Sequence, residues 1–108
     1  MALTAEDTLS SHDEMAENAR AASDLLKALS NETRLMILCM LAEEEKSVSD
    51  LEELLDMRQP TVSQQLARLR ADRLVTTRRD GKMIYYGLAS NEARAVIKVL
   101  YDIYCAPE

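Results

Sequence analysis

Apolar residues recur every three or four positions along most of the chain, which predicts a helix-rich protein. The first such stripe starts near His12 and consists of Met15, Ala19, Ala22, Leu25, Leu26 and Leu29. Ser30 and Asn31 interrupt it, and both are residue types that cap a following helix. Residues 1–11 lack a sustained apolar period. We therefore expect a flexible acidic tail over residues 1–11 and one domain over residues 12–108.

The second predicted helix contains an uninterrupted apolar run over residues 35–41. A helix that is apolar on every side is normally a buried helix, so we expect this one at the centre of the fold. The charged residues 43–46 mark its end.

Two short helices separated by a tight turn are predicted next. Ser47 with Asp50, or Ser49 with Glu52, fits a capping box at the start of the first helix. Pro60 suits the first turn of the second helix, where a backbone N–H would have no partner in any case. The apolar residues in helical phase on that second helix are Val62, Leu66 and Leu69. Together the two helices form a helix-turn-helix.

Residues 74–79 and 83–88 are rich in β-forming types and are joined through an Asp-Gly pair, which predicts a hairpin. Ser90 or Asn91 then caps a last helix with an apolar stripe of Ala93, Val96, Ile97, Leu100, Tyr101 and Tyr104. Two glycines and two prolines are too few for a turn-rich all-β fold. The predicted fold class is mainly α with a small β-hairpin, a winged helix-turn-helix of order α-α-α-α-β-β-α.

The charge distribution favours DNA binding although the 108 residues carry a net charge of -6. Residues 58–82 hold seven basic and two acidic side chains, whereas residues 1–57 hold four basic and fourteen acidic ones. The basic segment covers the second helix of the helix-turn-helix and the hairpin, where a DNA backbone would lie. A solvated basic surface is the alternative. The expected DNA contacts are Thr61, Ser63, Gln64, Arg68, Arg78, Arg79 and Lys82.

Cys39, Cys105 and His12 are too few for a zinc site, which takes about four nitrogen or sulfur ligands. We therefore expect no metal and no cofactor, and a solvated His12. The absence of a Cys-x-x-Cys motif, and of a histidine suited to act as a base beside either thiol, argues against a thiol enzyme. Taken alone, Cys39 in its apolar run has the character of an inert core thiol, and Cys105 of a more accessible one.

The chain has no apolar stretch near the ~18 residues of a membrane span and no cationic start typical of a secretory signal. These patterns predict a cytoplasmic protein with no membrane partner.

Three segments resemble the ArsR/SmtB superfamily of bacterial winged-helix repressors, and the resemblance covers roughly residues 25–104. The segments are residues 28–38 (ALSNETRLMIL), residues 59–66 (QPTVSQQL), and Arg79-Asp80-Gly81-Lys82 with Tyr85-Tyr86. The resemblance implies a homodimer, held by its first and last helices, that represses transcription on double-stranded operator DNA until an inducer binds. The two candidate dimer stripes, which fit an intramolecular core equally well, are Leu25/Leu26/Leu29 and Val96/Ile97/Leu100/Tyr104.

Metal sensing, well known in that superfamily, does not fit this chain. Its arsenic and cadmium/lead sensors carry a Cys-Val-Cys-like pair where this chain has Ser47-Val48-Ser49, and hydroxyls are poor ligands for soft metals. Its zinc sensors use histidine on the last helix, which has none here.

The two cysteines resemble those of the sulfide- and persulfide-responsive subgroup, often called SqrR/BigR-type. That resemblance implies that Cys39 and Cys105 are the sensing thiols, which persulfides or polysulfides link by a disulfide or by a bridge with extra sulfur atoms. Three alternatives remain open: a repressor that senses general oxidants, another ligand or a metal; a thiol enzyme; and a protein-interaction module that merely keeps the fold.

Overall fold

The computed structural model describes residues 12–105. Its elements are α2 (His12–Leu29), α3 (Glu32–Glu43), β1 (Lys46–Ser47), α4 (Val48–Leu55), α5 (Gln59–Ala71), β2 (Val75–Asp80), β3 (Met83–Leu88) and α6 (Asn91–Tyr104). The predicted helices and hairpin are confirmed in their order, and the short strand β1 is an addition. The expected tail, residues 1–11, lies outside the described residues.

Side chains at three helix starts explain where these helices begin. Asn31, Ser47 and Ser90 each accept a hydrogen bond from the backbone N–H three residues ahead, at 3.0, 3.1 and 3.0 Å. Of the two capping boxes that fit α4, the one between Ser47 and Asp50 forms, because the Asp50 carboxylate also accepts from the Ser47 N–H at 3.0 Å. Ser90, and not Asn91, caps α6.

The sheet is antiparallel with three strands in the order β1-β3-β2. β2 and β3 pair along their whole length around a turn at Gly81, whose φ of 65° is easy for glycine. In β1, Lys46 and Ser47 lie opposite Tyr86 and Tyr85 of β3. β1 leads directly into α4, so it fixes the base of the hairpin against the helix-turn-helix.

One core of buried apolar side chains joins all five helices to the hairpin. It consists of Ala28, Leu29, Ile37, Leu38, Leu41, Leu51, Val62, Leu66, Leu69, Leu74, Val75, Ala93 and Ile97. The three α5 residues predicted from helical spacing are all buried in it.

Helix α3 is not buried on every side, so that prediction is wrong for the single chain. Ile37 and Leu38 are fully buried, but Met36 is 41% exposed and Cys39 is also exposed. The reason is that α2, α5, α6 and β3 cover α3 on its inner side only. The uncovered side carries one of the two cysteines.

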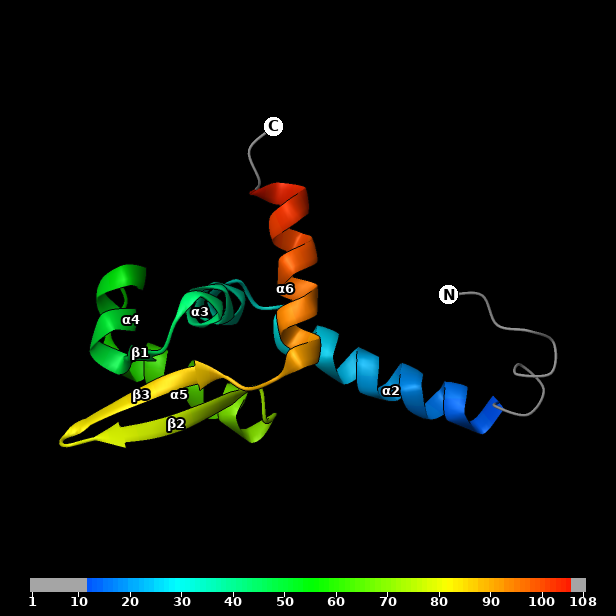
Figure 1. The fold of residues 1–108 in the computed structure, drawn as a ribbon, viewed down its shortest axis with the longest axis horizontal. Coiled ribbons are helices and arrows are strands. Elements are labelled where there is room, and N and C mark those ends of the chain that lie inside the picture. Colours follow the sequence, from blue (N-terminus) through cyan, green and yellow to red (C-terminus); the bar gives the residue numbers. More distant parts are fainter. Residues whose placement is uncertain (1–11, 106–108) are drawn as a thin grey trace.

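Helices α2 and α6 extend away from the body of the molecule, and the hairpin extends on the side opposite α2 (Figure 1). Of α2, only Ala28 and Leu29 are buried. The radius of gyration of 16.7 Å exceeds the roughly 13 Å of a compact chain of this length. Among the described residues, no helix combines the length and the apolar character that crossing a membrane requires.

Candidate nucleic-acid interface and thiol pair

Helix α5 has one apolar face buried in the core and one polar face open to solvent. Pro60 lies in its first turn, as predicted. Thr61, Gln64 and Arg68 are exposed on the open face, and Ser63 is half-buried at its flank. The structure therefore brings three of the four expected contacts of this helix onto one accessible face, and Ser63 lies at the edge of that face.

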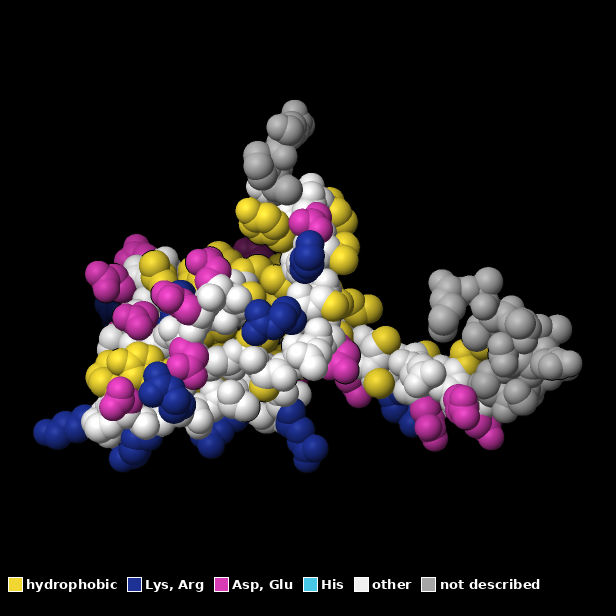
Figure 2. All heavy atoms as spheres, in the orientation of Figure 1, with side chains coloured by type: hydrophobic (Ala, Val, Ile, Leu, Met, Phe, Trp, Pro, Cys, Tyr) yellow, Lys and Arg dark blue, Asp and Glu magenta, His cyan; other side chains and the backbone are white. Residues whose placement is uncertain are grey.

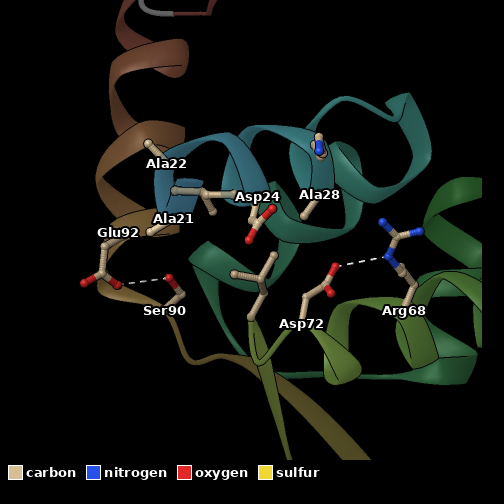
Figure 3. Close-up of a pocket in the computed structure, with 11 residues that line it drawn as sticks. Ala21, Ala22, Asp24, Ala28, Arg68, Asp72, Ser90 and Glu92 are labelled. Atoms are coloured by element: carbon tan, nitrogen blue, oxygen red, sulfur yellow. Dashed lines mark hydrogen bonds and ion pairs between the residues drawn. The ribbon is translucent and has the colours of Figure 1, made fainter. Parts of the chain in front are cut away.

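Arg68 reaches along α5 to Asp72, with Nε 3.1 Å from Oδ2. Asp72 also lines a depression of about 680 Å³ between α2, α5 and α6. In Figure 3 the side chains of Asp24 and Asp72 point into this depression, and Ala21 and Ala28 form part of its α2 wall. Both partners of the Arg68–Asp72 pair are exposed, so the pair is weak and a phosphate can compete for the guanidinium.

The far end of the hairpin combines two cations with two apolar side chains. Arg79 and Lys82 are exposed, and neither forms an ion pair within residues 12–105. Ile84 lies opposite Arg79 in the strand register and is 40% exposed, and Met83 is exposed to 41%. The hairpin, residues 75–88, is called the wing below.

Arg78 is held by groups within the protein, unlike Arg79. Its Nε is 2.9 Å from Oε1 of Glu45, and its guanidinium carbon lies 4.9 Å from the centre of the Tyr85 ring. The Glu45 side chain lies over Gly87, where an added Cβ would stand 3.4 Å from its Cγ. Arg78, which the sequence suggests as a DNA contact, thus ties the wing to the segment between α3 and β1.

Opposite charges are separated on the surface. Figure 2 shows lysine and arginine side chains along the edge that Figure 1 assigns to α5 and the wing, and aspartate and glutamate over α3, α4 and α2. A surface with this separation attracts a phosphate backbone at one edge and repels it elsewhere.

The two thiols lie within electrostatic reach of each other, on helices that pack together. Burial raises the pKa of the Cys39 thiol, and the negative charges of Cys105 and Glu43 raise it further. Both cysteines are free and exposed in the single chain. Cys39 is therefore not buried in the core of the single chain, because it lies on the open side of α3.

His12 is exposed at the start of α2. Within residues 12–105, no three His, Cys, Asp or Glu side chains converge in a way that could hold a metal ion.

The structure also reveals two long-range contacts that sequence reasoning missed. Glu45 pairs with Arg78 across 33 residues of sequence, and Arg34 donates to Gln65 across 31 residues. Neither separation follows a helical or strand period, so no local pattern pointed to these partners.

Residues 31–77 match the family described as "Bacterial regulatory protein, arsR family". The "Biofilm growth-associated repressor" of Agrobacterium fabrum is 50% identical to this chain over 94 residues, which cover 87% of this chain and 80% of that protein. The chain belongs to the ArsR family.

Solved structures of regulators agree with this assignment. Reduced HlyU from Vibrio cholerae superposes with a TM-score of 0.83 at 46% identity, covering 86% of this chain and 98% of that one. The transcriptional repressor BigR from Xylella fastidiosa superposes with a TM-score of 0.80 at 43% identity, and the match covers 89% of this chain and 98% of that one.

A third structure, from Mycobacterium bovis, is described as a homodimeric winged helix-turn-helix DNA-binding domain. It gives a TM-score of 0.73 at 30% identity and covers 84% of both chains. The predicted fold class and the BigR-type subgroup of the ArsR/SmtB superfamily are thus confirmed, and the chain is a winged helix-turn-helix regulator.

Proposed function

We propose that this protein is a homodimeric repressor that binds operator DNA and leaves it when reactive sulfur species link Cys39 and Cys105. The observation that carries the DNA-binding part is the exposed polar face of α5 beside the wing, where Arg79 and Lys82 form no ion pair with any other described residue. The switch is supported by the positions of the two thiols: Cys39 lies on α3 and Cys105 ends α6, these two helices pack together, and the charge of Cys105 acts on Cys39.

On DNA, α5 enters the major groove and the wing follows the backbone. Gln64 is of the type that hydrogen-bonds base edges, whereas Arg79 and Lys82 neutralise phosphates. A two-fold dimer presents two copies of α5, so its operator has half-sites about one or two helical turns apart.

The operator sequence is identified by letting the wild-type protein select duplexes from a random pool. Affinities for the selected duplex are then measured by fluorescence anisotropy. Gln64→Ala weakens binding to the selected duplex more than binding to a scrambled one, because it removes a base contact. Arg79→Ala weakens both and lowers the salt slope by about one. Unchanged specificity in Gln64→Ala would refute the base contact.

The partner in the dimer is a second copy packed against α2 and α6. Each of the two candidate dimer stripes contains both buried and exposed residues. Leu29 and Ile97 are buried within the chain, whereas Leu26 and Tyr104 are 58% and 79% exposed. The exposed residues are the ones available to the second subunit.

The thiol chemistry begins at Cys105, because the raised pKa of Cys39 lowers the thiolate fraction of that residue at neutral pH. The Cys105 thiolate attacks the outer sulfur of an organic persulfide RSSH and expels RSH, which leaves a persulfide on Cys105. Cys39, as its thiolate, then attacks the inner sulfur and releases H₂S. One donor thus gives a disulfide. When a second donor first converts Cys39 to a persulfide in the same way, with release of another RSH, the outer sulfur of that persulfide attacks the inner sulfur of the Cys105 persulfide. H₂S leaves, and the bridge then contains three sulfur atoms.

Linking the thiols acts on DNA binding only through a strain difference between the DNA-competent and released conformations. A 100-fold loss of operator affinity needs about 2.7 kcal/mol of coupling, within the usual range for allostery. α3 packs against both α5 and α6, so a bridge from α3 to the end of α6 can change the spacing of the two recognition helices.

The switch is tested with Cys39→Ser and Cys105→Ser, each compared with the reduced wild type on the selected duplex. Both variants keep tight binding and lose the response to an organic persulfide. Intact mass of the treated wild type shows either loss of two hydrogens or the same loss with an added sulfur. Dissociation of either variant on treatment would exclude the two-cysteine bridge, and equal release by hydrogen peroxide would favour a general oxidant sensor.

A further inference from the structure

Arg34, near the start of α3, connects α2 to α5 through a single guanidinium group. Its Nε donates to the carbonyl oxygen of Ala28 at 2.8 Å and its Nη2 to that of Lys27 at 3.3 Å. These carbonyls belong to the last turn of α2, where the negative end of the helix dipole favours a positive charge. The Lys27 carbonyl also accepts hydrogen bonds from the N–H and the hydroxyl of Ser30. The remaining nitrogen, Nη1, donates to Oε1 of Gln65 on α5 at 3.1 Å.

This contact fixes which way the Gln65 amide faces. A guanidinium only donates hydrogen bonds, so the amide oxygen must be the atom that faces Arg34. The amide nitrogen, with its two donor hydrogens, is therefore turned away from Arg34. Gln65 thus offers donors, and no acceptor, to whatever approaches from the other side.

Gln65 lies at the edge of the exposed face of α5. It is half-buried, and it follows Thr61 by four residues and precedes Arg68 by three, both of which are exposed. Residues at these spacings share one side of a helix. The edge of a helix in the major groove faces the groove wall, which consists of phosphates and sugars.

We propose that Arg34 is a positioning residue for DNA binding, which orients Gln65 so that its amide nitrogen donates to a phosphate oxygen of the DNA backbone. The inference rests on the proposed function, because it adds a phosphate contact to the interface of α5. It also gives α2 a direct link to this helix: a displacement of the last turn of α2 moves the acceptors of Arg34 and therefore Gln65.

The test uses the full-length reduced protein and two duplexes, the one selected by the wild type and a scrambled one. The variants are Arg34→Lys, which keeps the charge but lacks the fork of donors, Gln65→Met, which keeps the size but lacks the amide, and the double variant. Arg94→Lys is the matched control, since Arg94 donates to the Ala42 carbonyl at 3.1 Å and has no bond to α5. Thermal unfolding of each variant reports stability separately.

Each single variant is expected to bind both duplexes about tenfold more weakly, the effect of one hydrogen bond to a charged group. The double variant is expected to lose no more than either single one, because both changes remove the same phosphate contact. Arg94→Lys binds as the wild type does. The salt slope stays unchanged in Gln65→Met, since a neutral amide releases no counterion.

Additive losses would overturn the inference, because they would mean that Arg34 and Gln65 act independently. A loss of affinity confined to the selected duplex would also overturn the inference, because it would indicate a base contact. So would wild-type affinity in Gln65→Met. That variant tests the inference even if Arg34→Lys unfolds. Failure of the proposed function is distinguishable: in that case the wild type itself selects no duplex and binds neither one.

Discussion

The arginines of the interface differ in what holds each guanidinium before DNA arrives. Arg79 has no ion pair among the described residues, Arg68 has an exposed partner one helical turn away, and Arg78 is paired with Glu45 and lies over Tyr85. Arg79 can therefore bind a phosphate directly, whereas Arg68 and Arg78 must give up a carboxylate partner before they bind a phosphate. Residue type and net charge alone do not separate these cases.

Glu45→Gln is predicted to strengthen DNA binding several-fold and to steepen the salt slope by up to about one unit, because Arg78 becomes available to a phosphate. Glutamine keeps the size and an acceptor oxygen, so the wing stays in place. Fluorescence anisotropy at several salt concentrations measures both quantities.

The control for Glu45→Gln is Glu44→Gln, the neighbouring carboxylate, which pairs with Lys46 at 3.4 Å. Both changes alter the net charge equally. An equal gain in the control would mean that overall charge, not release of Arg78, is responsible. Weaker binding in Glu45→Gln would show that the Glu45–Arg78 pair positions the wing for DNA.

At the scale of elements, short segments depend on their ends and neighbours. α4 has only eight residues, too few for a stable isolated helix, and its capping box and the core contact of Leu51 compensate. β1 has two residues and exists because β3 offers an edge beside it. The helix-turn-helix and the wing are thereby held as one unit.

Asp50→Asn is predicted to lower thermal stability at neutral pH. Hydrogen bonds from the Ser47 backbone and side chain, with a smaller contribution from the Lys46 charge, lower the pKa of Asp50. A carboxyl with a lowered folded pKa stabilises the fold above its unfolded pKa of about 3.9, and this contribution disappears as the pH falls through the folded value.

The melting temperatures of wild type and Asp50→Asn should accordingly differ at pH 7 and converge below about pH 4. Glu53→Gln removes a carboxylate from the same helix outside the capping box, so it serves as the control. A difference between wild type and Asp50→Asn that persists unchanged in acid would contradict the ionic cap.

The sequence alone was sufficient to predict those elements that depend on interactions between residues close together in the chain. The spacing of Val62, Leu66 and Leu69, the cap at Ser47 and the turn at Gly81 all depend on neighbouring residues, and all three are confirmed. β1 was missed because Lys46-Ser47 has no β-forming character of its own.

The open side of α3 was missed for another reason. An apolar run such as residues 35–41 indicates how much apolar surface has to be buried. It does not indicate which neighbouring element buries that surface. The contacts of Glu45 and Arg34 likewise depend on how α3 is placed against the wing and α5, which periodicity does not encode.

At the scale of the whole molecule, the single chain leaves apolar surface uncovered on the two helices that extend from it. Val99, Tyr101, Ile103 and Tyr104 of α6 are 54–79% exposed. Several large apolar side chains exposed together are typical of a surface that binds another molecule and are unusual on a surface that only contacts solvent. Cys105 directly follows these residues, so the thiol pair and the proposed dimer surface are adjacent in the structure.

Ile103→Asp is therefore predicted to weaken the homodimer about thirty-fold or more, the usual effect of disrupting a central interface residue. Sedimentation velocity over a concentration series measures the shift to monomer. Leu54→Asp on α4 is the matched control, because Leu54 is 57% exposed against 65% for Ile103 and lies on a helix outside the proposed dimer surface. On the selected duplex, the Ile103 variant loses affinity because its two copies of α5 no longer bind as one unit, whereas the control keeps both its dimer and its affinity. A fully dimeric Ile103→Asp would exclude the end of α6 from the interface, and monomers in both variants would place the interface elsewhere on the chain.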